Sequence, residues 1–115
     1  MSGQSTGSRI DLGAVNGAGV GDGGVAHGER LVAFTEAVMG GDDAALDRER
    51  TALRAVLTPA EYVDVAGVIG AFNVVDRIAD STGIPLDGFL VGMSQEVRSE
   101  LDLARFASSA NTPTP

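Results

Sequence analysis

Hydrophobic positions recur with helical spacing from Glu29 onward. The apolar side chains stand three or four residues apart until Gly40-Gly41, and this spacing predicts a helix that the two glycines end. A second helix is expected to begin near Asp42 or Asp43, because an acidic side chain stabilises the positive end of the helix dipole. The inward positions of these two helices are Leu31, Phe34, Val38, Leu46, Leu53, Val56 and Leu57.

The clearest start of a helix is Thr58-Pro59-Ala60-Glu61. Thr58 is a good N-cap, Pro59 fits the first helical position, and Glu61 completes a capping box. We expect this helix to run unbroken to about Thr82. Gly83 is a natural left-handed stop, and the proline two residues later prevents the helix from resuming.

This long helix carries apolar residues on more than one face. One stripe consists of Tyr62, Val65, Ile69 and Phe72, and the other faces carry Val63, Ala66, Val74 and Ile78. An all-round apolar pattern is typical of a buried helix, so we expect it to be the central and most buried element. Gly67 and Gly70 would weaken the helix unless another helix packs closely there, and we interpret them as such a contact.

The two ends of the chain have a different character. Nine of the sixteen glycines fall within the first 28 residues, so we expect residues 1–28 to form a disordered, flexible tail. Ile10, Leu12 and Val15 within it suggest a weak strand or a docking segment. The helical domain is expected over 29–107, with a loop or turn over 87–93, a short helix within 94–107 and disorder over 108–115.

Composition restricts the function more than it identifies it. The 115 residues suit one domain, and sixteen acidic against eight basic residues give a net charge of -8, which disfavours nucleic acid as a partner. All basic residues are arginine, and without lysine or cysteine the chain has no Schiff-base lysine and no thiol chemistry. No apolar stretch is long enough to span a membrane, and we expect a cytoplasmic protein without a membrane partner.

Several motifs have both a structural and a chemical interpretation. Glycines with the G-x-G-x-x-G spacing of dinucleotide sites lie in the glycine-rich segment, which favours a linker. The pair His27 and Glu29, with two aspartates further on, has too few ligands for a metal site. Asp76, Arg77 and Asp80 are spaced for ion pairs on one helix, although paired carboxylates can also serve acid–base chemistry. In the first of these motifs the G-x-G-x-x-G spacing is formed by Gly19, Gly21 and Gly24. In the second, the two aspartates that follow His27 and Glu29 are Asp42 and Asp43.

The segment 71–80, Ala-Phe-Asn-Val-Val-Asp-Arg-Ile-Ala-Asp, followed by Thr-Gly-Ile-Pro-Leu-Asp at 82–87, resembles the C-terminal part of alkylhydroperoxidase D-like and carboxymuconolactone decarboxylase-like proteins. The resemblance extends over about residues 29–112. It implies an all-α bundle of three to four helices, completed by oligomerisation, since members usually assemble into trimers or hexamers. The resemblance implies that the structural motif residues are Phe72, Asn73, Asp76, Arg77 and Asp80, with Phe72 and Asn73 as core and interhelical residues and Arg77 as the anchor. Independently of the resemblance, a buried amide must find hydrogen-bond partners, so we expect Asn73 to join Arg77 in bonding to a neighbouring loop or helix end.

The chain lacks the Cys-x-x-Cys half on which the redox-active members depend. No catalytic residue, cofactor site or metal site is therefore carried over, and we expect a catalytically silent, half-length module that acts by self-assembly or by binding a companion chain. One alternative is a subunit of a split peroxidase or decarboxylase-type enzyme whose catalytic half is on another chain. Others are acid–base chemistry by Asp76, Asp80 or Glu61, and a ligand cleft beside Gly67 and Gly70.

Overall fold

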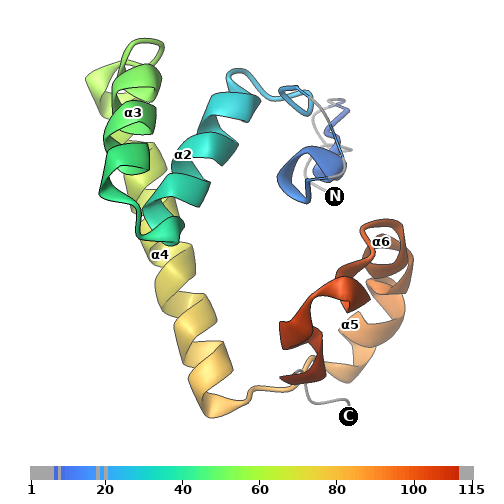
Figure 1. The fold of residues 1–115 in the computed structure, drawn as a ribbon. Helices are drawn as coiled ribbons and strands as arrows, with labels where there is room; N and C mark the ends of the chain where they lie inside the picture. Colours follow the sequence, from blue (N-terminus) through green and yellow to red (C-terminus); the bar gives the residue numbers. More distant parts are fainter. Residues whose placement is uncertain (1–6, 8, 18, 20, 112–115) are drawn as a thin grey trace. The chain divides into compact units, whose positions relative to one another are not determined.

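The computed structural model describes residues 7, 9–17, 19 and 21–111, and the chain is all-α over these residues, with no strand among them (Figure 1). This confirms the predicted all-α fold class. The elements are η1 (Leu12–Val15), α2 (Gly28–Gly40), α3 (Asp43–Arg54), α4 (Pro59–Thr82), α5 (Gly88–Met93), α6 (Gln95–Glu100), η2 (Leu103–Arg105) and η3 (Ala107–Asn111). None of the described helices is both long and apolar enough to cross a membrane.

The chain divides into two compact units, Met1–Ile69 and Gly70–Pro115, which we call unit 1 and unit 2. The boundary falls within α4, so this helix contributes its N-terminal half to unit 1 and its C-terminal half to unit 2.

Unit 1 is built on the hairpin of α2 and α3, which pack against each other (Figure 1). The predicted boundaries are confirmed: Gly41 ends α2 with a left-handed φ of 75°, and Asp42 caps α3. Oδ1 of Asp42 accepts hydrogen bonds from the backbone N–H groups of Ala44 at 2.9 Å and Ala45 at 3.1 Å. The buried apolar side chains are Phe34, Ala37 and Leu53.

The predicted capping box at the start of α4 is present. The backbone N–H of Thr58 donates to Oε2 of Glu61 at 2.8 Å, and the N–H of Glu61 donates to Oγ1 of Thr58 at 3.3 Å. At the other end Gly83 adopts a left-handed φ of 63°, and the N–H of Ile84 donates to the carbonyl of Ala79 at 3.2 Å. This bond closes a Schellman turn, so both ends of the helix form as their residues predict.

The expectation that α4 is the most buried element is wrong. No residue of α4 is buried, and Tyr62, Val65 and Ile69 are only half-buried. Phe72, the fourth member of the predicted stripe, is 66% exposed. The predicted helix contact at the glycines is also missing, since a Cβ atom built on Gly67 or Gly70 meets nothing within 4 Å. An apolar helix surface becomes buried only where a partner element covers it.

The described part of the glycine-rich segment lies in unit 1 and turns back toward α2. The strand considered for residues 10–15 is wrong, because Leu12–Val15 forms the 3-10 helix η1, which contacts α2. The N–H of Asp11 donates to the carbonyl of Gly23 at 2.8 Å. This hydrogen bond joins the backbone before η1 to the backbone before α2. Residues 1–6, 8, 18 and 20 of the predicted tail lie outside the described residues.

Close packing explains why two positions of this segment are glycine. A Cβ atom on Gly28 would collide with the carbonyl of Asp22, and one on Gly24 would collide with the carbonyl of Arg9. Gly24 also has a φ of 83°, a left-handed value that other residues adopt at a cost. Gly24 and Gly28 are therefore required by close backbone packing, and not only by the conformational freedom of glycine.

Unit 2 contains the C-terminal half of α4 and two short helices. The loop predicted over 87–93 is wrong, because Gly88–Met93 forms helix α5, and the helix predicted within 94–107 is only the six-residue α6. Arg98 of α6 donates from its guanidinium to the carbonyl of Val91 at 2.8 Å and ties the two helices together. Of the predicted disordered tail, residues up to Asn111 form η3, and 112–115 lie outside the described residues.

Candidate functional site

The residues of the family-like motif lie on the C-terminal half of α4 and do not enclose a site. Asn73 is half-buried, and Asp76, Arg77 and Asp80 are exposed. Nε of Arg77 donates to Oδ1 of Asn73 at 3.2 Å, one turn apart on the same helix. The expected bonds from Asn73 and Arg77 to a neighbouring loop or helix end are therefore replaced by a bond within α4. The expectation of Phe72 as a core residue is wrong, as its exposure shows.

The two aspartates of the motif are solvated carboxylates. The expected Arg77–Asp80 ion pair does not form, and within the described part of the chain the one ion pair joins Arg50 and Asp47 of α3. A carboxyl group is better suited to acid–base catalysis where burial or a close like charge raises its pKa. Asp76 and Asp80 are exposed and therefore lack such burial.

The carboxylate of Glu61 takes part in the cap of α4. The backbone N–H of Thr58 and then its hydroxyl donate to the carboxylate and lower the pKa of Glu61, since both bonds favour the charged form. A general acid at neutral pH needs the opposite shift. The geometry thus makes Glu61 a structural residue.

The other chemical motifs are dispersed. His27 precedes α2 with a left-handed φ of 58°, and Glu29 stands in the first turn of that helix. The two aspartates near residue 42 start α3, and no three His, Cys, Asp or Glu side chains among the described residues are grouped as metal ligands. The glycines with dinucleotide-like spacing lie in bends and a turn before α2, without a preceding strand in the described part.

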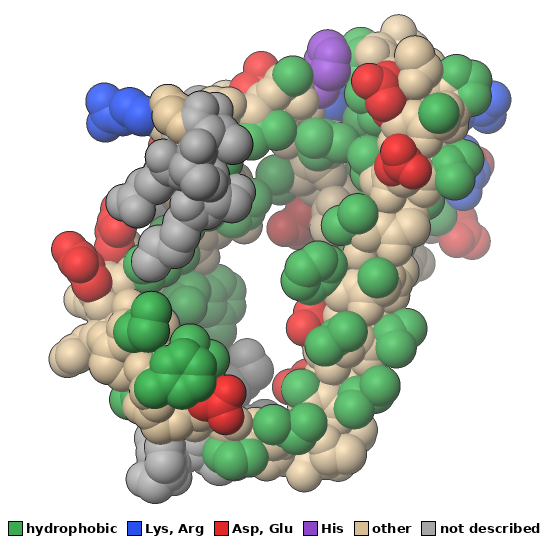
Figure 2. All heavy atoms as spheres, turned by 180° about the vertical axis from the view of Figure 1, so that it is seen from behind, with side chains coloured by type: hydrophobic (Ala, Val, Ile, Leu, Met, Phe, Trp, Pro, Cys, Tyr) green, Lys and Arg blue, Asp and Glu red, His purple; other side chains and the backbone are tan. Residues whose placement is uncertain are grey.

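The sequence analysis did not locate an exposed apolar side of α4 in unit 2. It consists of four exposed apolar side chains, which we call the α4 apolar surface: Phe72, Val74, Val75 and Ile78. Figure 2 shows hydrophobic side chains exposed along this long helix. At 3.6 residues per turn the four positions cover about 160° of the helix circumference, which is as wide as the stripe of a core-facing helix.

The polar motif residues occupy the opposite side of the same helix. Asn73, Asp76, Arg77 and Asp80 fall within an arc of about 100° by the same helical geometry. This polar side continues the half-buried stripe of Tyr62, Val65 and Ile69 from unit 1. The face of α4 that contacts the core in unit 1 therefore becomes the polar face in unit 2. The stripe Tyr62, Val65 and Ile69 can be extended by four residues to Asn73 instead of by three residues to Phe72. That choice would have predicted this change of face from the sequence.

No described side chain of unit 2 is buried. Besides the α4 apolar surface, Ile84, Phe89 and Met93 each expose more than half of their area. Isolated apolar residues on a surface are ordinary, but a unit with several of them and without a buried core is not. Comparisons of the chain with protein-family models, with curated proteins and with solved structures find no match.

Proposed function

We propose that the chain is a catalytically silent helical module that acts by self-association through unit 2. The observation that carries the proposal is the α4 apolar surface in a unit without any buried described side chain. Burial of one large apolar side chain contributes about 1.5–3 kcal/mol, so covering four of them is a substantial driving force for association. A second copy supplies an identical surface, as in most symmetric oligomers.

The resemblance of segment 71–87 to alkylhydroperoxidase D-like proteins supports the same proposal, because members of that superfamily assemble through their helices. The silent character is supported by the absence of cysteine and lysine from the sequence and by the solvated carboxylates of the motif. A cytoplasmic location is part of the proposal and rests on the sequence alone.

The test is the solution mass of the full chain, measured by size-exclusion chromatography with light scattering over a range of concentrations. The proposal expects a discrete oligomer. Val75→Asp places a charge on the α4 apolar surface and should give a monomer, since a buried unpaired charge is costly. Ala60→Asp adds the same charge in the first turn of α4 and should leave the oligomer intact.

A monomeric wild-type chain would contradict self-association, as would an oligomer that survives both Val75→Asp and Phe72→Asp. The split-enzyme alternative makes a different prediction. A companion chain that contains a Cys-x-x-Cys pair would co-purify with the wild-type protein and would be lost with Val75→Asp. That result would assign the α4 apolar surface to the companion chain instead of a second copy.

A further inference from the structure

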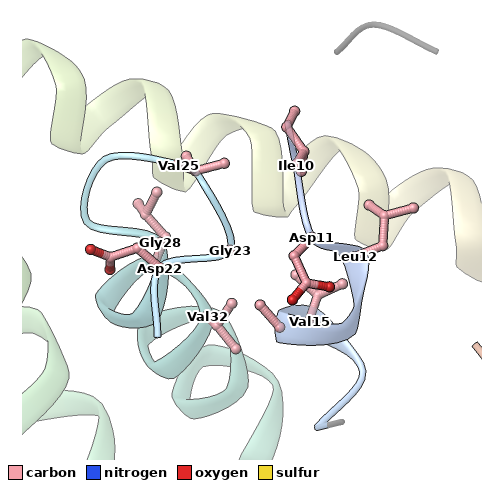
Figure 3. Close-up of a pocket in the computed structure, with 11 residues that line it drawn as sticks. Ile10, Asp11, Leu12, Val15, Asp22, Gly23, Val25, Gly28 and Val32 are labelled. Carbon is pink, nitrogen blue, oxygen red and sulfur yellow. The ribbon is translucent and has the colours of Figure 1, made fainter. Parts of the chain in front are cut away.

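A small apolar cavity lies in unit 1, between the glycine-rich segment and α2 (Figure 3). Its volume is about 140 Å³. α2 contributes Gly28, Leu31 and Val32 to one wall, and the other walls come from the glycine-rich segment. The apolar side chains of those walls belong to Ile10, Leu12, Ala14, Val15 and Val25.

Hydrogen bonds between turns hold the walls in place. The N–H of Asp11 donates to the carbonyl of Gly23 at 2.8 Å, and the N–H of Gly19 donates to the carbonyl of Gly13 at 2.7 Å. Oδ1 of Asp22 accepts from the N–H of Glu29 at 3.0 Å and fixes the segment to the start of α2. The cavity is therefore formed by the fold and not by one movable side chain.

The chemistry of the lining selects the kind of molecule that fits. Asp11 and Asp22 are the charged residues among the lining residues, so an anionic ligand would meet like charges. Oδ1 of each carboxylate already accepts a backbone N–H, from Gly13 at 2.8 Å for Asp11 and from Glu29 for Asp22. The remaining lining side chains offer no hydrogen-bonding group, which favours an uncharged apolar ligand.

The size of the cavity narrows the choice further. A closed apolar cavity of about 150 Å³ in a protein accepts benzene. This pocket has a similar volume of about 140 Å³ and is open to solvent on one side, so its size suits one aromatic ring. Ile10, Leu12 and Val25 are 44%, 47% and 41% exposed at the rim, and an occupant would cover part of that apolar surface. We propose that this cavity binds a small uncharged molecule about the size of one aromatic ring.

The experiment is a titration of the full-length chain with toluene, followed by backbone amide NMR. Saturable shifts are expected for the amides of Leu12, Val25 and Val32, which line the cavity. Val32→Phe fills the cavity from α2 and should weaken toluene binding by about tenfold or more. Val63→Phe is the matched control, because Val63 lies on α4, does not line the cavity and is 66% exposed. It should bind toluene like the wild type.

A second filling variant, Val15→Phe, keeps the test decisive if Val32→Phe fails to fold, because Val15 is exposed on η1. Benzoate has the same ring with a negative charge and should bind at least about tenfold more weakly than toluene. Non-saturable shifts, shifts spread over the exposed side of α4, or filling variants that bind like the wild type would overturn the proposal. Equal binding of benzoate and toluene would overturn the selectivity for an uncharged ligand.

Discussion

The aromatic rings of Phe34 and Tyr62 lie with their centroids 5.6 Å apart and their planes at 50°. Phe34 belongs to α2 and Tyr62 to the first turns of α4, so this contact joins the two helices within unit 1. The guanidinium of Arg54 adds a cation–π contact, with its central carbon 6.0 Å from the Tyr62 ring centroid. The attachment of α4 to the hairpin therefore depends on a small number of side chains.

Loss of the buried ring at this junction should be costly. Phe34 is 3% exposed, so Phe34→Ala is expected to lower the free energy of unfolding by about 3–5 kcal/mol, through lost burial and the cavity that remains. Urea unfolding followed by circular dichroism would measure this change. Phe106→Ala is the matched control, because Phe106 is exposed and should cost about 1 kcal/mol or less. Equal losses in the two variants would contradict the assignment of Phe34 to the core.

Removal of the cap hydroxyl should weaken the start of α4. Thr58→Ala leaves the N–H of Glu61 without its acceptor, and we expect a loss of about 1 kcal/mol in the free energy of unfolding. Thr58→Ser keeps the hydroxyl and should retain most of the stability. Thermal unfolding of both variants beside the wild type would measure the difference. A serine variant as unstable as the alanine variant would argue against capping as the cause.

The same cap predicts a dependence of stability on pH. The pKa of Glu61 is lowered in the folded chain by the bonds from Thr58, so its contribution is present above the ordinary carboxyl pKa near 4.5. The contribution is lost as the pH falls through the lowered folded-state pKa. Glu61→Gln should therefore be less stable than the wild type at neutral pH, and this difference should shrink in acid. Urea midpoints between neutral pH and about pH 3 would show it, with Glu36→Gln as a control for an exposed glutamate outside the cap.

Two glycine substitutions should act with opposite signs. Gly67→Ala adds a methyl group that meets nothing within 4 Å inside α4, and it should raise the free energy of unfolding by about 1 kcal/mol. Gly28→Ala adds the same group where it collides with the carbonyl of Asp22, and it should destabilise the chain. The two unfolding temperatures would be compared with that of the wild type. Destabilisation by Gly67→Ala would instead indicate a close packing contact at that position.

Local chemistry made the helix boundaries predictable from the sequence. Each helix boundary depends on backbone groups within a few residues of the residue that caps or ends the helix, so it can be read from the sequence itself. These residues are Gly41, Asp42, Thr58 and Gly83. The six-residue α5 was missed because its N-cap, Asp87, makes no side-chain capping bond and the helix is too short for a periodic pattern.

Burial and the cavity depend on contacts that are distant in the sequence. The apolar content of α4 indicates that the helix needs a partner, but the spacing alone does not tell which side finds one within the chain. The N-terminal cavity depends on the bond between Asp11 and Gly23 and on close backbone packing at Gly28, neither of which leaves a periodic signal. The expected bonds of Asn73 and Arg77 to a neighbouring element do not appear in the structure, where the two side chains bond to each other within α4 instead.

The carboxylate of Asp22 reaches across seven positions to the N–H of Glu29, whereas His27, the residue before α2, makes no side-chain cap bond. A shortened chain that starts at Glu29 would therefore lose an acceptor at the start of its first long helix, together with the wall that shields Leu31 and Val32. Proteolytic cleavage between Asp22 and Glu29 would also detach this acceptor from α2. The segment thus stabilises the N-terminal end of α2, and recombinant boundaries that keep this bond and the pocket wall should begin before Ile10.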